Sequence, residues 1–171
     1  MQPDQGNTVL QFLLPTLENE INTTRKVIGA VPADKGDYKP DDRSMSALEL
    51  CWHIVGAESF FTTAITTGAF PTPGKMPENI KSSQDVLVWY EGQASSNLSK
   101  LKALTGEHCV KVVESPIGAR PVIEFFQIMI NHSIHHRGQL SAYLRPMGAK
   151  VPSIYGSSRD DKEAKQAAGK A

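Results

Sequence analysis

Apolar residues recur at alternating spacings of three and four along residues 7–31, and this pattern constrains the fold more than any other feature. The stripe consists of Leu10, Leu14, Leu17, Ile21, Thr24, Ile28 and Val31. Such spacing places its members on one face of an α-helix. Pro15 lies near the start of the segment and predicts a kink or a break in the first turns. The chain therefore opens with a long amphipathic helix.

Three further segments have the same character, at residues 44–67, 84–104 and 121–144. Ser44 and Ser83 are candidate N-caps, because a serine hydroxyl accepts a hydrogen bond from an unpaired backbone amide. Pro121 suits a first helical position, and Pro146 with Gly148 ends the last helix. Four long helices with hardly any strand pattern predict an all-α fold, an antiparallel four-helix bundle.

The connections are rich in breaker residues. Residues 32–43 form a loop. The connections over 68–82 and 105–120 are long for a bundle, so each either contains a short helix or strand or covers another part of the molecule. Residues 110–113 have slight strand character, but one lone strand cannot form a sheet. We expect one domain over residues 1–156, followed by a flexible, disordered polar tail over 157–171.

Charge and composition exclude several functional classes. Eighteen basic residues balance eighteen acidic ones in a chain of 171 residues, which leaves no surplus charge for binding nucleic acid or an anionic membrane. No apolar run approaches the roughly 18–20 residues of a membrane span, and residues 1–5 do not resemble a signal peptide. Two cysteines are too few for a disulfide scaffold. We expect a soluble cytoplasmic protein that acts on a small molecule.

Three of the five histidines lie within residues 132–136. His132 and His136 are four apart, so their imidazoles share one helix face, and the apolar residues that continue this face indicate that it points into the bundle. His53 in the second helix lies on a face with Leu50, Gly56, Ala57 and Phe60. The two small residues would leave room beside its imidazole for an ion or a substrate.

Three neutral imidazoles with an open position are typical of a catalytic metal site. Zinc suits these ligands, and nickel, iron or manganese are alternatives because imidazole binds most first-row divalent ions. The pattern also fits a hydrogen-bonded histidine cluster in the core, so the spacing alone leaves both interpretations open. We interpret His135 as an edge residue and His108 as an ordinary loop residue.

The last predicted helix resembles a known signature. The run from His132 to Leu140 (HSIHHRGQL), followed by Tyr143-Leu144-Arg145 and Gly148, resembles the DinB-like (damage-inducible) family of metal-binding four-helix bundles. Residues 52–58 (WHIVGAE) resemble that family's second-helix histidine segment, and residues 152–156 (PSIYG) resemble its closing segment. The similarity extends over residues 7–156. It implies a divalent ion, zinc or nickel in first place, held by His53, His132 and His136.

The resemblance also implies a function, because related members include transferases and isomerases that use a low-molecular-weight thiol and often dimerise. We therefore expect a homodimeric metal-dependent transferase or isomerase, with a small-molecule substrate. The alternatives are a non-enzymatic metal-binding or stress-response bundle, and a plain dimerisation module. An ion would favour a bound thiol as thiolate, so no protein nucleophile is needed, and Cys51 is interpreted as a buried structural thiol.

Several polar side chains could complete such a site. Glu49 or Glu58 could orient an imidazole, and Gln139 could face the open coordination side. Arg137 is a candidate for anchoring a carboxylate, although a structural pair across helices is the favoured interpretation. Tyr155 is a candidate for closing over the site.

Overall fold

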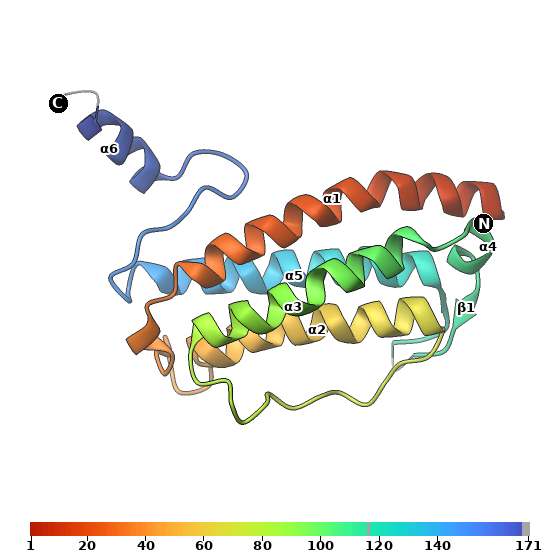
Figure 1. The fold of residues 1–171 in the computed structure, drawn as a ribbon, viewed down its shortest axis with the longest axis horizontal. Helices are drawn as coiled ribbons and strands as arrows, with labels where there is room; N and C mark the ends of the chain where they lie inside the picture. Colours follow the sequence, from red (N-terminus) through yellow and green to blue (C-terminus); the bar gives the residue numbers. More distant parts are fainter. Residues whose placement is uncertain (116, 169–171) are drawn as a thin grey trace.

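A computed structural model describes residues 1–115 and 117–168, and four long helices form its body (Figure 1). These helices are α1 (Pro3–Gly29), α2 (Ala47–Thr67), α3 (Ser83–Lys102) and α5 (Val122–Leu144). Helix α1 contacts α3 and α5, and α2 contacts the same two helices, so the four close around one core. The expected all-α four-helix bundle is confirmed.

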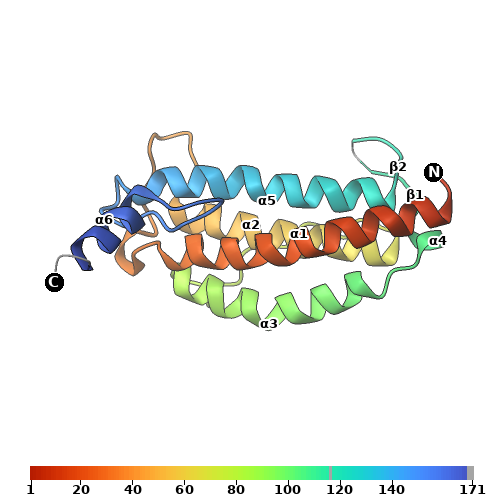
Figure 2. The same cartoon turned by 90° about the horizontal axis from the view of Figure 1, so that it is seen from above.

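The directions of the helices differ from the antiparallel arrangement that we expected. Helices α2 and α3 run the same way, and α1 and α5 run the opposite way (Figures 1 and 2). The connection over 68–82 makes this order possible, because it returns from the end of α2 to its beginning before α3 starts. An extended chain of that length can span the bundle, at about 3.3 Å per residue. The sequence prediction of antiparallel neighbours is therefore wrong for α2 and α3.

Small elements join the long ones. A 3-10 turn, η1 (Ala33–Lys35), follows α1, and the short helix α4 (Gly106–Cys109) follows α3. Strands β1 (Val112–Val113) and β2 (Arg120–Pro121) pair antiparallel, so the strand character of 110–113 does find a partner. Pro121 belongs to β2 and occupies the N-cap position of α5, one residue before the first helical position. Of the connection 105–120, residue 116 lies outside the described residues.

The helix boundaries follow from local capping. Ser46, not Ser44, caps α2: its hydroxyl accepts from the Glu49 amide at 3.2 Å, and the Glu49 carboxylate accepts from the Ser46 amide at 2.7 Å. Ser82, not Ser83, forms the corresponding capping box with Asp85 at the start of α3. Gly68 ends α2 in the left-handed region at φ 78°, a conformation that glycine adopts without strain.

Helix α1 continues through Pro15 rather than breaking there. The apolar stripe is buried on both sides of the proline, from Leu10 to Ile28, so packing outweighs the lost backbone hydrogen bond. The core that this stripe joins is apolar and includes Leu50, Ile54, Phe125 and Phe126. No helix within residues 1–115 and 117–168 is long and apolar enough to cross a membrane.

The C-terminal segment departs from the expected unstructured tail, because Arg159–Ala168 forms helix α6. Ser158 and Asp161 cap its first turn reciprocally, with the Asp161 amide 3.0 Å from the serine hydroxyl. Asp160 accepts hydrogen bonds from Arg145 and from the Val151 amide, both at 2.9 Å, which anchors the start of α6 to the chain after α5. Residues 169–171 of the expected tail lie outside the described residues.

Candidate metal centre

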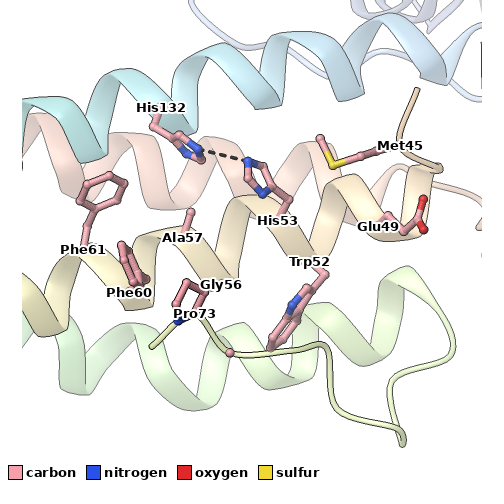
Figure 3. A pocket seen from close by; sticks show the side chains of 11 residues that line it. Met45, Glu49, Trp52, His53, Gly56, Ala57, Phe60, Phe61, Pro73 and His132 are labelled. Atoms are coloured by element: carbon pink, nitrogen blue, oxygen red, sulfur yellow. Dashed lines mark hydrogen bonds between the residues drawn. The ribbon is translucent and has the colours of Figure 1, made fainter. Parts of the chain in front are cut away.

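Three histidines from two helices converge between α2 and α5. Helical spacing places His132 and His136 on one face of α5, and α2 presents His53 opposite them. The Nε2 atom of His53 lies 3.1 Å from Nε2 of His132 and 3.1 Å from Nε2 of His136. Figure 3 shows the imidazoles of His53 and His132 pointing toward each other. The three residues that the sequence selects as ligands therefore lie together.

The donor set fits a divalent ion. Two imidazole nitrogens on a tetrahedral zinc ion, each at about 2.0–2.1 Å, lie about 3.3 Å apart, close to the separations seen here. The three candidate ligand atoms all lie within 4.8 Å of one another. Hydrogen bonding alone does not explain the cluster, because a neutral imidazole has one N–H and a lone pair on its other nitrogen. A cation between the three nitrogens would satisfy all of them.

Burial holds two of these imidazoles, those of His53 and His132, in the neutral form that binds metals. Burial lowers the pKa of His132 to about 4, with further lowering from the neighbouring histidines. Burial also lowers the pKa of His53, and the charge of His136 adds to that effect. At neutral pH both rings are therefore uncharged, so an ion would not have to displace protons from them.

Gln139 orients one of the three imidazoles. Its amide oxygen lies 2.8 Å from Nδ1 of His136. Because an amide oxygen only accepts hydrogen bonds, Nδ1 donates to it, and in the neutral tautomer that this contact selects the lone pair is on Nε2, which faces the other histidines. The amide nitrogen of Gln139 lies 3.3 Å from Nε2 of His135, an exposed residue at the edge of the helix. Gln139 thus supports the cluster from behind His136.

Neither glutamate that the sequence suggested as a support contacts the histidines through a hydrogen bond within the described residues. The carboxylate of Glu49 caps α2, and it lies 3.7 Å from Lys39 Nζ. Glu58 is buried and accepts a hydrogen bond from the Tyr90 hydroxyl at 2.8 Å. Burial raises the pKa of Glu58 to about 7, against the lowering effects of Tyr90 and Arg25. The buried Nδ1 of His132 has no partner among the described residues.

Arg137 and Tyr155 lie in a separate polar cluster. The Arg137 guanidinium forms a buried ion pair with Glu20 of α1, which is the pair across helices that the sequence interpretation favoured. It also donates to the Tyr155 hydroxyl at 2.6 Å, and that hydroxyl donates to the Glu20 carboxylate at 2.9 Å. Tyr155 therefore joins the chain after α5 to α1, and its hydroxyl does not reach toward the triad.

The two cysteines are buried and free. Burial raises the pKa of Cys51 to about 12, and it also raises the pKa of Cys109. A thiol in this state is a poor nucleophile, which agrees with the structural role expected for Cys51. His108, in α4, lies with Nε2 2.6 Å from the carbonyl oxygen of Ile65, a contact that ties α4 to the end of α2.

A cavity of about 520 Å³ opens beside the triad, with His53 and His132 in its wall. Most of the other lining residues are apolar. They come from the residue before the cap of α2, from α2 itself and from the connection over 68–82 (Figure 3): Met45, Trp52, Gly56, Ala57, Phe60, Phe61, Pro73 and Gly74. The long connection therefore covers part of the site, one of the two roles expected for it. The sequence analysis placed Phe60 on the face of His53 but did not identify Trp52 as a site residue, although the spacing of Trp52, Gly56 and Phe60 at every fourth position marks one face of α2.

Comparisons with known proteins agree with this architecture. Residues 6–167 match the sequence model of the DinB family. The chain is 30% identical over 148 residues to the uncharacterized protein YjoA of Bacillus subtilis, and the alignment covers 84% of this chain and 92% of that protein. It is 24% identical over 153 residues to the uncharacterized protein YrdA of the same organism, covering 89% and 91%.

Two crystal structures resemble the fold. The DinB-like protein YjoA of Bacillus subtilis aligns with a TM-score of 0.69 at 25% identity, covering 88% of this chain and 99% of that one. A DinB-like protein of Bacillus cereus aligns with a TM-score of 0.71 at 21% identity, covering 84% and 95%. The second likeness shows the fold alone.

Proposed function

The chain belongs to the DinB family, and on that premise we propose that it is a divalent-metal enzyme that transfers a low-molecular-weight thiol to a small electrophile. The observation that carries the proposal is the convergence of three imidazole Nε2 atoms at the wall of an open cavity. A closed structural site has four protein ligands, whereas three ligands beside a cavity leave room for an exogenous one.

His53, His132 and His136 would hold the ion, with zinc or nickel as the first candidates and iron or manganese as alternatives. A bound divalent ion would lower the pKa of a coordinated thiol and so supply the nucleophilic thiolate at neutral pH. The protein's own contribution is to hold the imidazoles of His53 and His132 neutral and to orient that of His136. Burial performs the first task for His53 and His132, and Gln139 performs the second for His136.

The proposed reaction is a substitution at carbon. The thiol gives its proton to solvent, its sulfur forms a bond to the electrophilic carbon, and the leaving group departs with the electrons of the broken bond. The cysteines of this chain are buried, so the reaction would use the sulfur of the small thiol rather than that of a protein side chain. The homodimer expected from the resemblance stays a prediction, which sedimentation equilibrium tests.

Metal analysis and a thiol-transfer assay test the proposal. We expect about one divalent ion per chain in the purified protein, and loss of that ion in His132→Ala. His135→Ala is the matched control, because it removes an exposed histidine of the same helix that lies outside the triad. A correctly folded wild-type protein that takes up no divalent ion would contradict the proposal.

Chelation separates the enzyme from a non-enzymatic metal-binding bundle. A catalytic ion should leave with little unfolding, while arylation of cysteine or glutathione by an electron-poor chloroarene falls to the uncatalysed rate. A structural ion should instead take much of the fold's stability with it, because its binding free energy is then part of folding. The apolar core around the triad favours the first outcome, since it is packed by aliphatic and aromatic side chains without the histidines.

A further inference from the structure

Among the described residues, the titratable side chains in the wall of the cavity beside the triad are those of His53, His132 and Glu49. The Glu49 carboxylate already accepts a hydrogen bond from the Ser46 amide, so the histidines are the polar groups left for a ligand. His53 and His132 expose imidazoles to it, and the rest of its wall consists mainly of aromatic and aliphatic side chains. Its volume of about 520 Å³ lies within the roughly 300–1,000 Å³ of small-molecule sites. A molecule that fills the cavity would therefore carry an apolar body and direct a single polar group toward the histidines.

The wall has the geometry of an aromatic site. The Trp52 indole lies against the backbone of α2 at Gly56, where an added Cβ would be 3.4 Å from Cε2 of the ring. Phe61 lies with its ring centroid 5.7 Å from that of Phe60 and 5.9 Å from that of His132. Ring faces and edges placed in this way offer the offset and edge-to-face contacts that aromatic molecules prefer.

A second cavity of about 300 Å³ extends this wall. It shares Trp52, Gly56 and Phe60 with the first and adds Trp89 from α3, whose ring centroid lies 4.8 Å from that of Trp52. The two cavities therefore meet along one face of α2, beneath the connection over 68–82. A ligand longer than one ring could extend from the triad along this face.

Charge narrows the ligand further. Within the part of the chain that the structure describes, no lysine or arginine lines the larger cavity, and Glu49 is the one carboxylate in its wall. The smaller cavity has one cationic side chain in its wall, that of Lys75. Away from the histidines, an anionic group placed among these apolar side chains would lose its hydration without gaining a cationic partner. Low-molecular-weight thiols of the peptide type carry carboxylates, so the apolar wall is unsuited to their charged ends.

We propose that this cavity binds the electrophile of the reaction, and that the electrophile is an uncharged aromatic molecule with one polar group near the triad. The assignment of the ligand as electrophile rests on the proposed function. Binding of an uncharged aromatic body does not, because the apolar wall is present without an ion.

Tryptophan fluorescence tests the binding directly, because both tryptophans of the chain, Trp52 and Trp89, line the two cavities. The probe is 4-bromobenzyl alcohol, whose bromine quenches indole emission, and its charged counterpart is 4-bromobenzoate. We expect saturable quenching by the alcohol in the full-length protein at pH 7.5, both as purified and after dialysis against a chelator. In the metal-free protein the benzoate should bind at least tenfold more weakly.

Ala57→Leu provides the variant, because Ala57 is half-buried in the cavity wall and a larger side chain there would occupy the ligand's space. It should raise the dissociation constant of the alcohol at least tenfold. Ala142→Leu makes the same substitution at an exposed position of α5 outside the cavities and should leave the constant unchanged. Trp52→Phe should remove most of the saturable quenching and so locate the bound ring.

Three outcomes would overturn the inference: quenching that stays linear with probe concentration, equal affinity in Ala57→Leu and wild type, or benzoate binding as tightly as the alcohol in the metal-free protein. Each of these can occur while the protein still binds one ion per chain and transfers a thiol. Conversely, saturable binding of the alcohol by a protein that takes up no ion would uphold the aromatic site and refute the proposed function.

Discussion

Helix α5 contributes neighbouring residues to two polar clusters that differ in their chemistry. His136 belongs to the histidine triad, and Arg137, the next residue, belongs to a cluster with the buried Glu20 and the hydroxyl of the exposed Tyr155. One step along a helix turns the side chain by about 100°, so the two residues face different helices. The triad faces α2, while the arginine faces α1.

The clusters differ in whether their members satisfy one another. Arg137 donates to a carboxylate and a hydroxyl, and the hydroxyl donates in turn to the same carboxylate, so donors and acceptors match. The triad instead brings together three like groups, whose ring nitrogens cannot all pair with one another. Burial of polar groups therefore does not by itself mark a functional site. A functional site is indicated when the donors and acceptors of a cluster cannot all pair with one another and require a ligand or an ion.

Removing one member of the matched cluster should have the largest effect on stability. Arg137→Ala leaves the Glu20 carboxylate buried without its cation, and we expect it to lower the free energy of unfolding by about 3–5 kcal/mol. Urea denaturation of the metal-free protein measures this change. Arg145→Ala is the matched control: its ion pair with Asp160 is half-exposed at 2.9 Å, so its loss should cost at most about 1 kcal/mol.

A double variant tests whether the loss of stability in Arg137→Ala comes from the unpaired Glu20 carboxylate. Arg137→Met with Glu20→Leu replaces both charges by apolar side chains and should recover much of the loss. If Arg137→Ala were no more destabilising than Arg145→Ala, the cluster would not be the matched, structural unit described here.

Glu58 is an intermediate case, since it is buried with a hydrogen bond from Tyr90 and forms no ion pair within the described residues. Its pKa rises from 4.5 to about 7 on folding, chiefly because of burial. Between these values the folded state binds the proton and the unfolded state does not, so stability falls as pH rises. Glu58→Gln keeps an acceptor for Tyr90 but cannot titrate. We expect it to remove about 3 kcal/mol of the fall in stability between pH 4.5 and pH 7.

Urea denaturation of both metal-free proteins at a series of pH values measures this difference. Glu91→Gln is the control, because Glu91 is exposed on α3 and its replacement should leave the pH profile unchanged. The histidines titrate alike in all three proteins, so they cancel in the comparison. Parallel profiles for wild type and Glu58→Gln would show that Glu58 is ionised in the fold.

Much of the architecture could be predicted from local pattern. The stripe of α1 follows from spacing alone, and the pair His132 and His136 shares a face because four residues make about one helical turn. Helix α6 was also predictable, because Ser158 and Asp161 have the spacing of a capping box, but the polar composition of the segment outweighed that signal in the prediction.

Other features depend on distant parts of the chain and leave little local trace. Glu20 pairs with a residue 117 positions away, so neither side chain indicates its partner in the sequence. The parallel direction of α2 and α3 depends on the path of the connection over 68–82, whose proline and glycine residues indicate only a loop. Residues of that kind fix no single backbone path, so the cover over the cavity could not be derived.

For the histidine triad, we expect a large change in the free energy of unfolding only when an ion is present. An ion at one hundred times its dissociation constant should stabilise the wild-type protein by about 2.7 kcal/mol. In His132→Ala the same addition should change the free energy of unfolding by less than about 1 kcal/mol. Thermal or urea unfolding with and without zinc measures both, and His135→Ala should respond like wild type. Equal stabilisation of His132→Ala would place the ion elsewhere.

The smallest effect concerns Gln139, which connects the triad to the rest of α5 without binding the ion itself. Its amide oxygen fixes the proton on Nδ1 of His136, so Gln139→Ala should weaken ion binding by about tenfold while leaving one ion per chain at saturation. Gln139→Glu should bind the ion more tightly than wild type, because a carboxylate accepts that proton more strongly. Competition with a chromophoric chelator measures the dissociation constants.

Gln127→Ala is the control for this last change. Gln127 also lies on α5 and donates to Asn131 at 3.0 Å, so the variant removes a comparable hydrogen bond of the same helix outside the triad. Its ion affinity should equal that of wild type. If Gln139→Ala matched Gln127→Ala, the imidazole of His136 would be held by packing rather than by its hydrogen bond. The side chains of the triad would then be held in place by their packing, as those of the Arg137 cluster are held by their mutual contacts. The triad would differ from that cluster only in needing an ion to satisfy its ring nitrogens.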